Sequence, residues 1–239
     1  AGSIPIVQAG ALQSASHLPP VGFVSAAAGR LAADAVVAAT QAALRGEVSA
    51  VVTAPLHKES LALAGVDYPG HTEMLQALCA AYQGVPVSRL PVRMMLANED
   101  LKTVLVSIHI PLREALDSLT QAGIVDTLRI TDAFLRRTGL PSPRLAVAGI
   151  NPHAGEGGLF GREEIDTIAP AIAQAQALGI QASGPYAPDT VFMRARRRPQ
   201  MPNGEFDAVI AMYHDQGLIP VKYLGVEQGV NVTLGLPIV

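Results

Sequence analysis

The chain has 239 residues, of which 49% are hydrophobic and 15% are charged, and its formal net charge at pH 7 is −3. This length and composition are typical of a globular protein with a sizeable core, and the acidic balance argues against a nucleic-acid-binding protein, which would usually be basic. No apolar run approaches the roughly 18 residues needed to span a membrane, so we expect a protein without nucleic-acid or membrane partners.

The single cysteine, Cys79, excludes an internal disulfide bond and fits a reducing compartment. We therefore expect a cytoplasmic protein. Cys79 lies in an apolar run with helical spacing. A buried, inert thiol is expected there rather than a nucleophile.

The hydrophobic pattern predicts alternating helices and strands after an irregular segment over residues 1–29. Helices are expected over 30–44, from an N-cap at Thr72 to 83, from Pro111, over 124–137, and over 162–178. Strands are expected over 48–53, 92–97, 103–108, 144–150, 180–183 and 207–213, with a further apolar stretch over 229–235.

Two features refine this pattern. The connection Asn98–Asp100 between two of the strands is so short that it demands an antiparallel hairpin, and the sheet is therefore mixed. Pro170 lies inside the helix predicted over 162–178, so a kink or two abutting helices are expected there. The Ala, Val and Leu content indicates helices packed on a largely parallel sheet.

A glycine-rich stretch, residues 149–161, lies between a buried strand and the acidic first turn of a helix. In α/β proteins, ligands bind at the carboxyl ends of the strands. Glycines there let backbone N–H groups approach a ligand, and a helix start accepts an anion. The alternative is an ordinary glycine-rich connection with an incidental histidine.

Three histidines have the same predicted placement. His109, His153 and His214 each follow a predicted strand by no more than a few residues. If those strands are neighbours, the imidazoles converge at one edge of the sheet, and three such ligands with open positions describe a catalytic metal site. A structural site would usually have four ligands, often with cysteine. The alternative is that each histidine is a hydrogen-bonded loop or core residue. His17, in a proline-rich loop, has no such placement and is expected at the surface.

Several further polar residues suit an anionic substrate. They are Lys58, His71, Thr72, Lys222 and Asn231. Asp189, in a loop flanked by proline, is a candidate metal ligand or proton acceptor, or else an ordinary turn aspartate. Three acidic residues near the histidines are candidates to orient them, namely Glu156, Asp166 and Asp215.

A dinucleotide-binding fingerprint is absent from the glycine-rich stretch. Gly155, Gly157 and Gly158 do not complete the G-x-G-x-x-G spacing, because residue 160 is Phe. Any nicotinamide cofactor would have to bind without the usual Rossmann turn. The basic run Arg194–Arg198 is expected to be a solvated loop rather than a phosphate contact.

Several short blocks of the chain resemble the 4-hydroxythreonine-4-phosphate dehydrogenase family. They occur in the family's order and spread from about residue 30 to the end of the chain. The blocks are Ala54–Lys58, Gly70–Glu73, Gly149–Gly158, Glu163–Asp166, Gly184–Thr190, Met212–Gly217 and Gly229–Pro237.

The resemblance implies an α/β fold like that of isocitrate and isopropylmalate dehydrogenases. Such a fold has mixed, mostly parallel sheets in two lobes, with the active site in the cleft between them. It also implies a homodimer with the metal site at the subunit interface. Residues 1–239 would then form one two-lobed catalytic unit, without the family's N- and C-terminal segments and without much of its NAD site. We assign no lobe boundary.

The family's functional residues fall on positions already considered. The resemblance implies His109, His153 and His214 as metal ligands. It implies substrate contacts at His71, Thr72, Lys222 and Asn231, and Asp189 matches an aspartate near the metal. Lys222 or Asp189 is the candidate base for the substrate hydroxyl.

The implied reaction uses NAD, with NADP as the alternative, and a divalent metal such as zinc, magnesium or cobalt. It oxidises 4-phosphohydroxy-L-threonine, and the resulting β-keto acid loses carbon dioxide to give 3-amino-2-oxopropyl phosphate. This reaction belongs to pyridoxal 5'-phosphate (vitamin B6) biosynthesis. Alternatives are a dehydrogenase of 4-phosphorylated threonate or erythronate on the same fold, a non-catalytic metal-binding fragment, and a phosphate-binding protein whose histidines are structural.

Overall fold

The computed structural model describes residues 3–10 and 18–239, so His17 lies outside the described residues. The chain divides into two compact units: the first is Ala1–Leu90 with Leu236–Val239, and the second is Pro91–Gly235. In the described part of the chain, no helix is long and apolar enough to cross a membrane.

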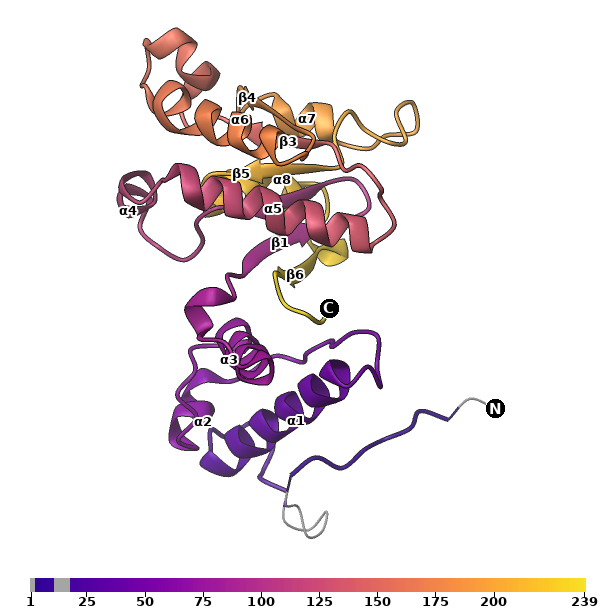
Figure 1. Ribbon diagram of the computed structural model, residues 1–239. Helices are drawn as coiled ribbons and strands as arrows, with labels where there is room; N and C mark the ends of the chain where they lie inside the picture. Colours follow the sequence, from indigo (N-terminus) through magenta and orange to yellow (C-terminus); the bar gives the residue numbers. More distant parts are fainter. Residues whose placement is uncertain (1–2, 11–17) are drawn as a thin grey trace. The chain divides into compact units, whose positions relative to one another are not determined.

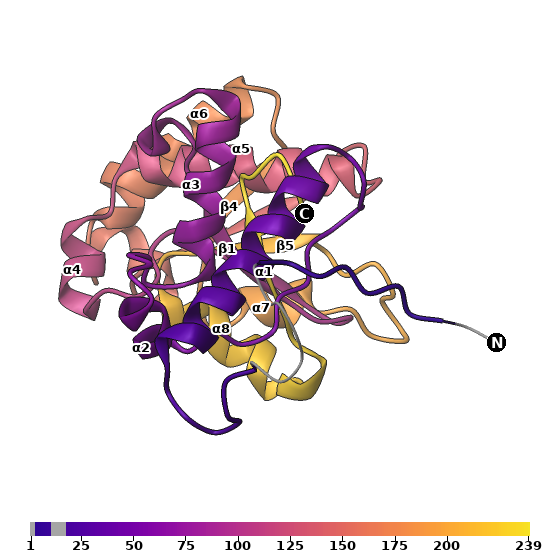
Figure 2. The same cartoon turned by 90° about the horizontal axis from the view of Figure 1, so that it is seen from below.

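The first unit is helical. Its elements are α1 (Ala26–Leu44), α2 (Lys58–Leu63), α3 (His71–Gln83) and the 3-10 turn η2 (Val87–Arg89). Figure 2 shows α1 together with α2 and α3, which both pack against it. At Gly29 the backbones of α1 and α2 come so close that a Cβ atom would lie 1.9 Å from the Ser60 carbonyl oxygen. Only glycine fits this crossing.

Two sequence predictions for the first unit are wrong. Residues 48–53 form no strand: the Val51 N–H donates to the Val239 carbonyl at 2.7 Å, and Val52 is 95% exposed. Apolar β-branched residues favour a strand only where a partner covers them. In addition, α3 starts at His71 with Gly70 as its N-cap, so Thr72 is the second helical residue and not the cap.

The second unit contains a six-stranded sheet with the order β4-β3-β5-β2-β1-β6. Its strands are β1 (Arg93–Ala97), β2 (Lys102–Leu105), β3 (Leu145–Ala148), β4 (Ala182–Tyr186), β5 (Ala208–Ala211) and β6 (Val230–Leu234). The neighbours β4, β3, β5 and β2 pair in parallel, whereas β1 pairs antiparallel with β2 and β6. The mixed sheet and the predicted hairpin are confirmed.

The helical elements of the second unit are α4 (Leu112–Asp117), α5 (Gln121–Arg137), η3 (Pro152–Gly158), η4 (Glu164–Ile168), α6 (Ala169–Ala177), α7 (Val191–Ala195), α8 (His214–Tyr223) and η5 (Val226–Gln228). The three helices predicted for the second unit are present, whereas α7 and α8 were not predicted, and Arg194 of the run expected as a loop lies in α7. Pro170 lies in the first turn of α6, directly after the π-helical η4, which confirms two abutting helical segments. Pro111 is the N-cap of α4 rather than its first residue.

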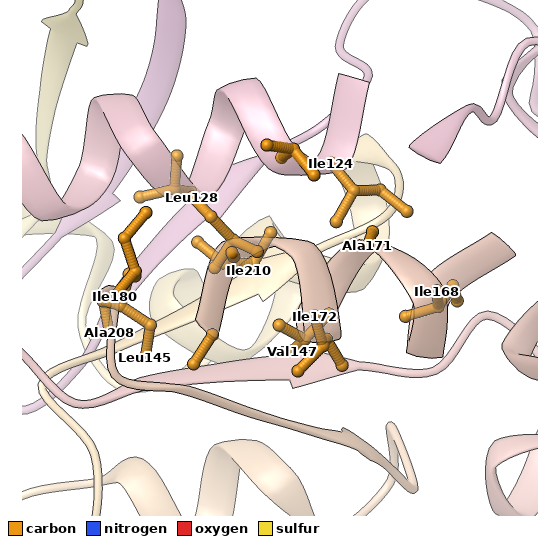
Figure 3. Packing of buried hydrophobic residues seen from close by; sticks show 14 of the residues in the cluster. Ile124, Leu128, Leu145, Val147, Ile168, Ala171, Ile172, Ile180, Ala208 and Ile210 are labelled. Carbon is orange, nitrogen blue, oxygen red and sulfur yellow. The ribbon is translucent and has the colours of Figure 1, made fainter. Parts of the chain in front are cut away.

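Helices lie over both faces of the sheet (Figure 1), and the central strands β3 and β5 are buried along their whole length. Helices α5 and α6 cover one face, where Leu128, Ile172 and Ile210 meet (Figure 3). Helices α7 and α8 cover the other face, which receives the intervening strand residues, such as Val209 of β5. Strands buried on both faces need continuous apolar runs, which the sequence has in β3 and β5.

We expect Leu128→Ala to lower the free energy of unfolding by about 2–5 kcal/mol, because it leaves a cavity in a packed core. Leu128 is fully buried, with 0% exposure. Leu178→Ala is the matched control, since Leu178 is 58% exposed. Urea denaturation of both variants measures the difference, and equal losses would contradict this description of the core.

A second expectation concerns Asp207, whose carboxylate accepts hydrogen bonds from the Arg144 backbone N–H at 2.8 Å and from its guanidinium at 3.0 and 3.1 Å. Burial by itself raises the pKa of Asp207, but the Arg144 hydrogen bonds and charge outweigh burial and hold the pKa below its usual value. A lowered folded-state pKa stabilises the protein above the unfolded-state pKa of about 3.9, and this stabilisation is lost as pH falls through the folded value.

We therefore expect Asp207→Asn to be less stable than the parent chain at neutral pH. The difference between the two should narrow as pH falls below about 4, where the carboxylate of the parent becomes protonated. Urea unfolding at several pH values measures it. A difference that stays constant over that range would show that the charge of Asp207 does not contribute.

Candidate functional site

Three neighbouring parallel strands end at the same edge of the sheet. The strands β3, β5 and β2 are adjacent in that order, and His153, His214 and His109 follow them in the chain. The strands that precede the three histidines are therefore neighbours, as the metal-site hypothesis required. Carboxyl ends of neighbouring parallel strands are where α/β proteins place ligands.

Gln216 ties two of these strand ends together. Its side chain is buried, its Nε2 donates to the Gly149 carbonyl at 2.8 Å, and its Oε1 accepts from the Met212 N–H at 2.7 Å. Both Oε1 and Nε2 of the Gln216 amide are thus hydrogen-bonded in the protein interior, where an unpaired polar group would be costly. Because Gln216 lies in the first turn of α8, the same contacts hold the start of the helix that carries His214.

His109 and His214 are brought together. Their ring centroids lie 5.5 Å apart. The Nδ1 atom of His214 lies 2.7 Å from Oδ1 of Asp215, which was expected to orient a histidine. Because a carboxylate only accepts, Nδ1 donates this hydrogen bond, and the neutral tautomer with its proton on Nδ1 keeps at Nε2 the lone pair that a metal-binding imidazole requires.

His153 lies on a left-handed turn within the glycine-rich stretch. Residues 153–157 all have positive φ, including the non-glycine residues His153 (52°), Ala154 (52°) and Glu156 (43°). Such a conformation costs about 1–2 kcal/mol for each non-glycine residue. The exposed His153 ring lies 6.2 Å from the ring of Phe160.

Within residues 3–10 and 18–239, no group of three or more His, Cys, Asp or Glu side chains lies close enough to hold a metal ion. His153 is thus not gathered with the pair formed by His109 and His214. The assignment of all three as metal ligands stays a prediction.

Glu164 is the functional candidate that sequence reasoning missed. It is 2% exposed, and its Oε1 accepts the backbone N–H groups of Ile150 at 2.7 Å and Asn151 at 2.8 Å. The sequence instead indicated Asp166 as a residue that orients a histidine. Asp166 lies on the exposed helix surface, where its Oδ1 atom lies 2.9 Å from Nη2 of Arg162. The only signal in the sequence was the Glu163–Glu164 pair, which does not show which carboxylate turns inward.

The neighbouring carboxylate, Glu163, remains ionised at neutral pH. A hydrogen bond from its own backbone N–H and a second from the Asn151 side chain lower its pKa. The Asn151 Nδ2 group lies 2.6 Å from Glu163 Oε2 and 2.9 Å from Glu164 Oε2. One amide group thus donates to two carboxylates.

Two positions in the first unit bear on substrate binding. His71 is the first residue of α3, and its buried Nε2 atom has no hydrogen-bond partner among the described residues. Buried polar atoms without a partner are rare and point to a missing partner, which suits a substrate-binding residue. Lys58, the first residue of α2, is exposed.

Three predicted residues of the second unit are exposed. Lys222 lies in the last turn of α8, Asn231 lies on β6 opposite Leu96 of β1, and Asp189 lies in the turn before α7. Exposure leaves their polar groups accessible to a ligand. Their roles in substrate binding and proton transfer, and that of Thr72, stay predictions.

Cys79 plays no chemical part here. It is fully buried in α3, and burial raises its pKa to about 11. The thiolate is therefore scarce at neutral pH. The prediction of a buried, inert thiol is confirmed.

Comparison with solved structures supports the assignment of fold. The crystal structure of 4-hydroxythreonine-4-phosphate dehydrogenase from Klebsiella pneumoniae is 48% identical and superposes with a TM-score of 0.81, over 95% of this chain and 65% of that chain. The predicted fold class is confirmed: this is a mixed α/β fold of the isocitrate dehydrogenase type.

Curated relatives carry two enzyme names. A 4-hydroxythreonine-4-phosphate dehydrogenase of Beijerinckia indica is 52% identical over 229 residues, which are 96% of this chain and 64% of the relative. A D-threonate 4-phosphate dehydrogenase of Salmonella typhimurium is 50% identical over 218 residues, 91% of this chain and 62% of the relative. The chain thus spans less than two thirds of either relative.

The family profile described as pyridoxal phosphate biosynthetic protein PdxA matches residues 2–239. This match covers nearly the whole chain, and the relatives just described agree with it. The chain belongs to the pyridoxal phosphate biosynthetic protein PdxA family.

Proposed function

We propose that this protein is an NAD-dependent and divalent-metal-dependent dehydrogenase of a 4-phosphorylated hydroxy acid. Its proposed substrate is 4-phosphohydroxy-L-threonine. The substrate hydroxyl is oxidised to a ketone by hydride transfer, and the resulting β-keto acid loses carbon dioxide to give 3-amino-2-oxopropyl phosphate. The observation that supports this proposal is that β2, β3 and β5, the strands that precede His109, His153 and His214 in the chain, are adjacent and parallel.

The two imidazoles gathered at this edge suit a divalent ion. His109 and His214 lie with ring centroids 5.5 Å apart, and the His214 tautomer that donates from Nδ1 to Asp215 keeps a lone pair at Nε2. Among the described residues, His153 is not gathered with this pair. We propose these two histidines, together with His153, as the ligands of zinc, magnesium or cobalt. When bound, such an ion polarises the substrate hydroxyl and stabilises the negative charge that develops on decarboxylation.

The chain's own residues supply binding and proton transfer in this proposal. His71, with its unpartnered Nε2, and Thr72 hold polar groups of the substrate. Lys222 and Asn231 are further contacts, and the ammonium of Lys222 suits an anionic group. Lys222 or Asp189 accepts the proton of the substrate hydroxyl. We further propose NAD rather than NADP as hydride acceptor, and a cytoplasmic homodimer with the metal site at its interface.

A second candidate substrate is D-threonate 4-phosphate. The observation that favours it is the 50% identity to a relative of that name, close to the 52% for the 4-hydroxythreonine-4-phosphate dehydrogenase. The two substrates differ at C2, where one has an amino group and the other a hydroxyl group. A site that binds one of these groups by buried hydrogen bonds discriminates strongly against the other.

We expect metal-dependent NADH formation from 4-phosphohydroxy-L-threonine, because the hydride leaves from a hydroxyl carbon activated by the ion. The measurement is absorbance at the NADH band, with divalent metal and with chelator, with D-threonate 4-phosphate and 4-phospho-D-erythronate offered in parallel. Preference for threonate would establish the second candidate. Metal binding without turnover of any substrate would indicate a non-catalytic metal-binding chain.

We expect alanine at His109, His153 or His214 to weaken metal binding by more than the about 100-fold typical for loss of an outer-shell partner. Titration with Zn²⁺ against a competing chelator measures it. The control is His57→Asn, because His57 caps α2 by accepting the Ser60 N–H and asparagine preserves that cap. Full metal occupancy in His153→Ala would refute its assignment as a ligand.

A further inference from the structure

The glycine-rich loop, residues 149–161, holds a conformation that its own residues disfavour. Within the described residues, the positive-φ positions other than glycine are His153, Ala154 and Glu156, all in this loop. Left-handed backbone is unfavourable for such residues and persists only where the surroundings impose it. Some contact must therefore hold the turn that carries His153.

Glu164 is a buried side chain that lies against this loop. Its carboxylate is 2% exposed and lies between two glycines of the loop: a Cβ atom would lie 2.9 Å from its Oε1 at Gly149 and 2.8 Å from its Oε2 at Gly155. It accepts three hydrogen bonds, from the N–H groups of Ile150 and Asn151 and from the Asn151 side chain, at 2.7, 2.8 and 2.9 Å. The start of the loop is thus wrapped around one buried carboxylate.

We propose that Glu164 is a positioning residue, whose buried carboxylate holds the loop in the left-handed turn that places His153 at the carboxyl end of β3. The part of this inference that concerns metal binding rests on the proposed function. The Glu164 carboxylate is buried, and its oxygens already accept hydrogen bonds from Ile150 and Asn151. In this proposal it therefore acts through His153 and does not contact substrate.

The surrounding groups donate hydrogen bonds to both oxygens of Glu164, so the site requires a carboxylate there and not an amide. Asn151 Nδ2 donates to both Glu163 and Glu164, so both must present oxygen. Gln at 164 can accept the two backbone N–H groups with its one oxygen, but its NH₂ group then faces the NH₂ group of Asn151. Turning the Asn151 amide does not help, because its oxygen would then face the Glu163 carboxylate.

This polarity supplies a matched set of variants. Glu163→Gln is the control, since a less buried glutamine is able to turn its oxygen toward Asn151. Glu164→Gln breaks the network. In the double variant Glu163→Gln/Glu164→Gln, the Asn151 amide turns over and its oxygen accepts from both new NH₂ groups, so the network forms again with its polarity reversed.

The experiment compares these chains with the parent by Co²⁺ titration, using the visible spectrum of the bound ion, and by hydrogen exchange at Ile150 and Asn151. Circular dichroism first establishes that each chain is folded. Glu164→Gln is expected to lose about 10- to 100-fold in Co²⁺ affinity, to alter the Co²⁺ spectrum and to exchange faster at both amides. Glu163→Gln should match the parent, and the double variant should recover both properties.

The two proposals fail differently. If the parent chain binds no Co²⁺, the metal part of the proposed function is refuted, and hydrogen exchange alone decides the role of Glu164. If the parent binds Co²⁺ and folded Glu164→Gln matches it in affinity, spectrum and exchange, Glu164 is not a positioning residue. Loss in both Glu164→Gln and the double variant, without recovery, would also overturn the inference, because the polarity of the network would then not matter.

Discussion

Parallel pairing of β3, β5 and β2 is the constraint on which the candidate site depends. Ile210 of β5 lies opposite Val147 of β3 on one side and Val104 of β2 on the other. The hydrogen-bonded ladder therefore keeps the three strands in register, so that all three end at the same edge of the sheet. Helices cover both faces of the sheet, so the loops at these carboxyl ends are where a ligand can approach the strands.

Beyond the ladder, buried polar side chains hold the site. Gln216 joins the segments that follow β3 and β5, and Glu164 holds the first residues after β3. Each uses its polar atoms on backbone groups that the sheet has left unpaired. A buried donor or acceptor without a partner costs about 1–3 kcal/mol, so these contacts favour the observed paths of the loops.

The glycine-rich loop shows how this arrangement serves a site. Its backbone is left-handed at His153, Ala154 and Glu156, a conformation that is uncommon for residues other than glycine. The hydrophobic core that contains Leu128 and Ile210 stabilises the folded chain, and this stabilisation offsets the unfavourable backbone conformation of the turn. Strain of this kind persists in proteins where surrounding contacts over-determine the backbone, and it is common at ligand sites.

The sequence by itself determined the elements whose signal is local. The hairpin around Asn98, the break at Pro170 and the placement of three histidines after strands were all readable, because periodicity, turn residues and proline act over a few positions. The family blocks added the expected fold and chemistry. Only the tertiary structure decided that residues 48–53 form no strand, that Glu164 rather than Asp166 turns inward, and that His109 meets His214. Each of these depends on a partner that is distant in the chain or set by the path of a loop, and no local pattern specifies it.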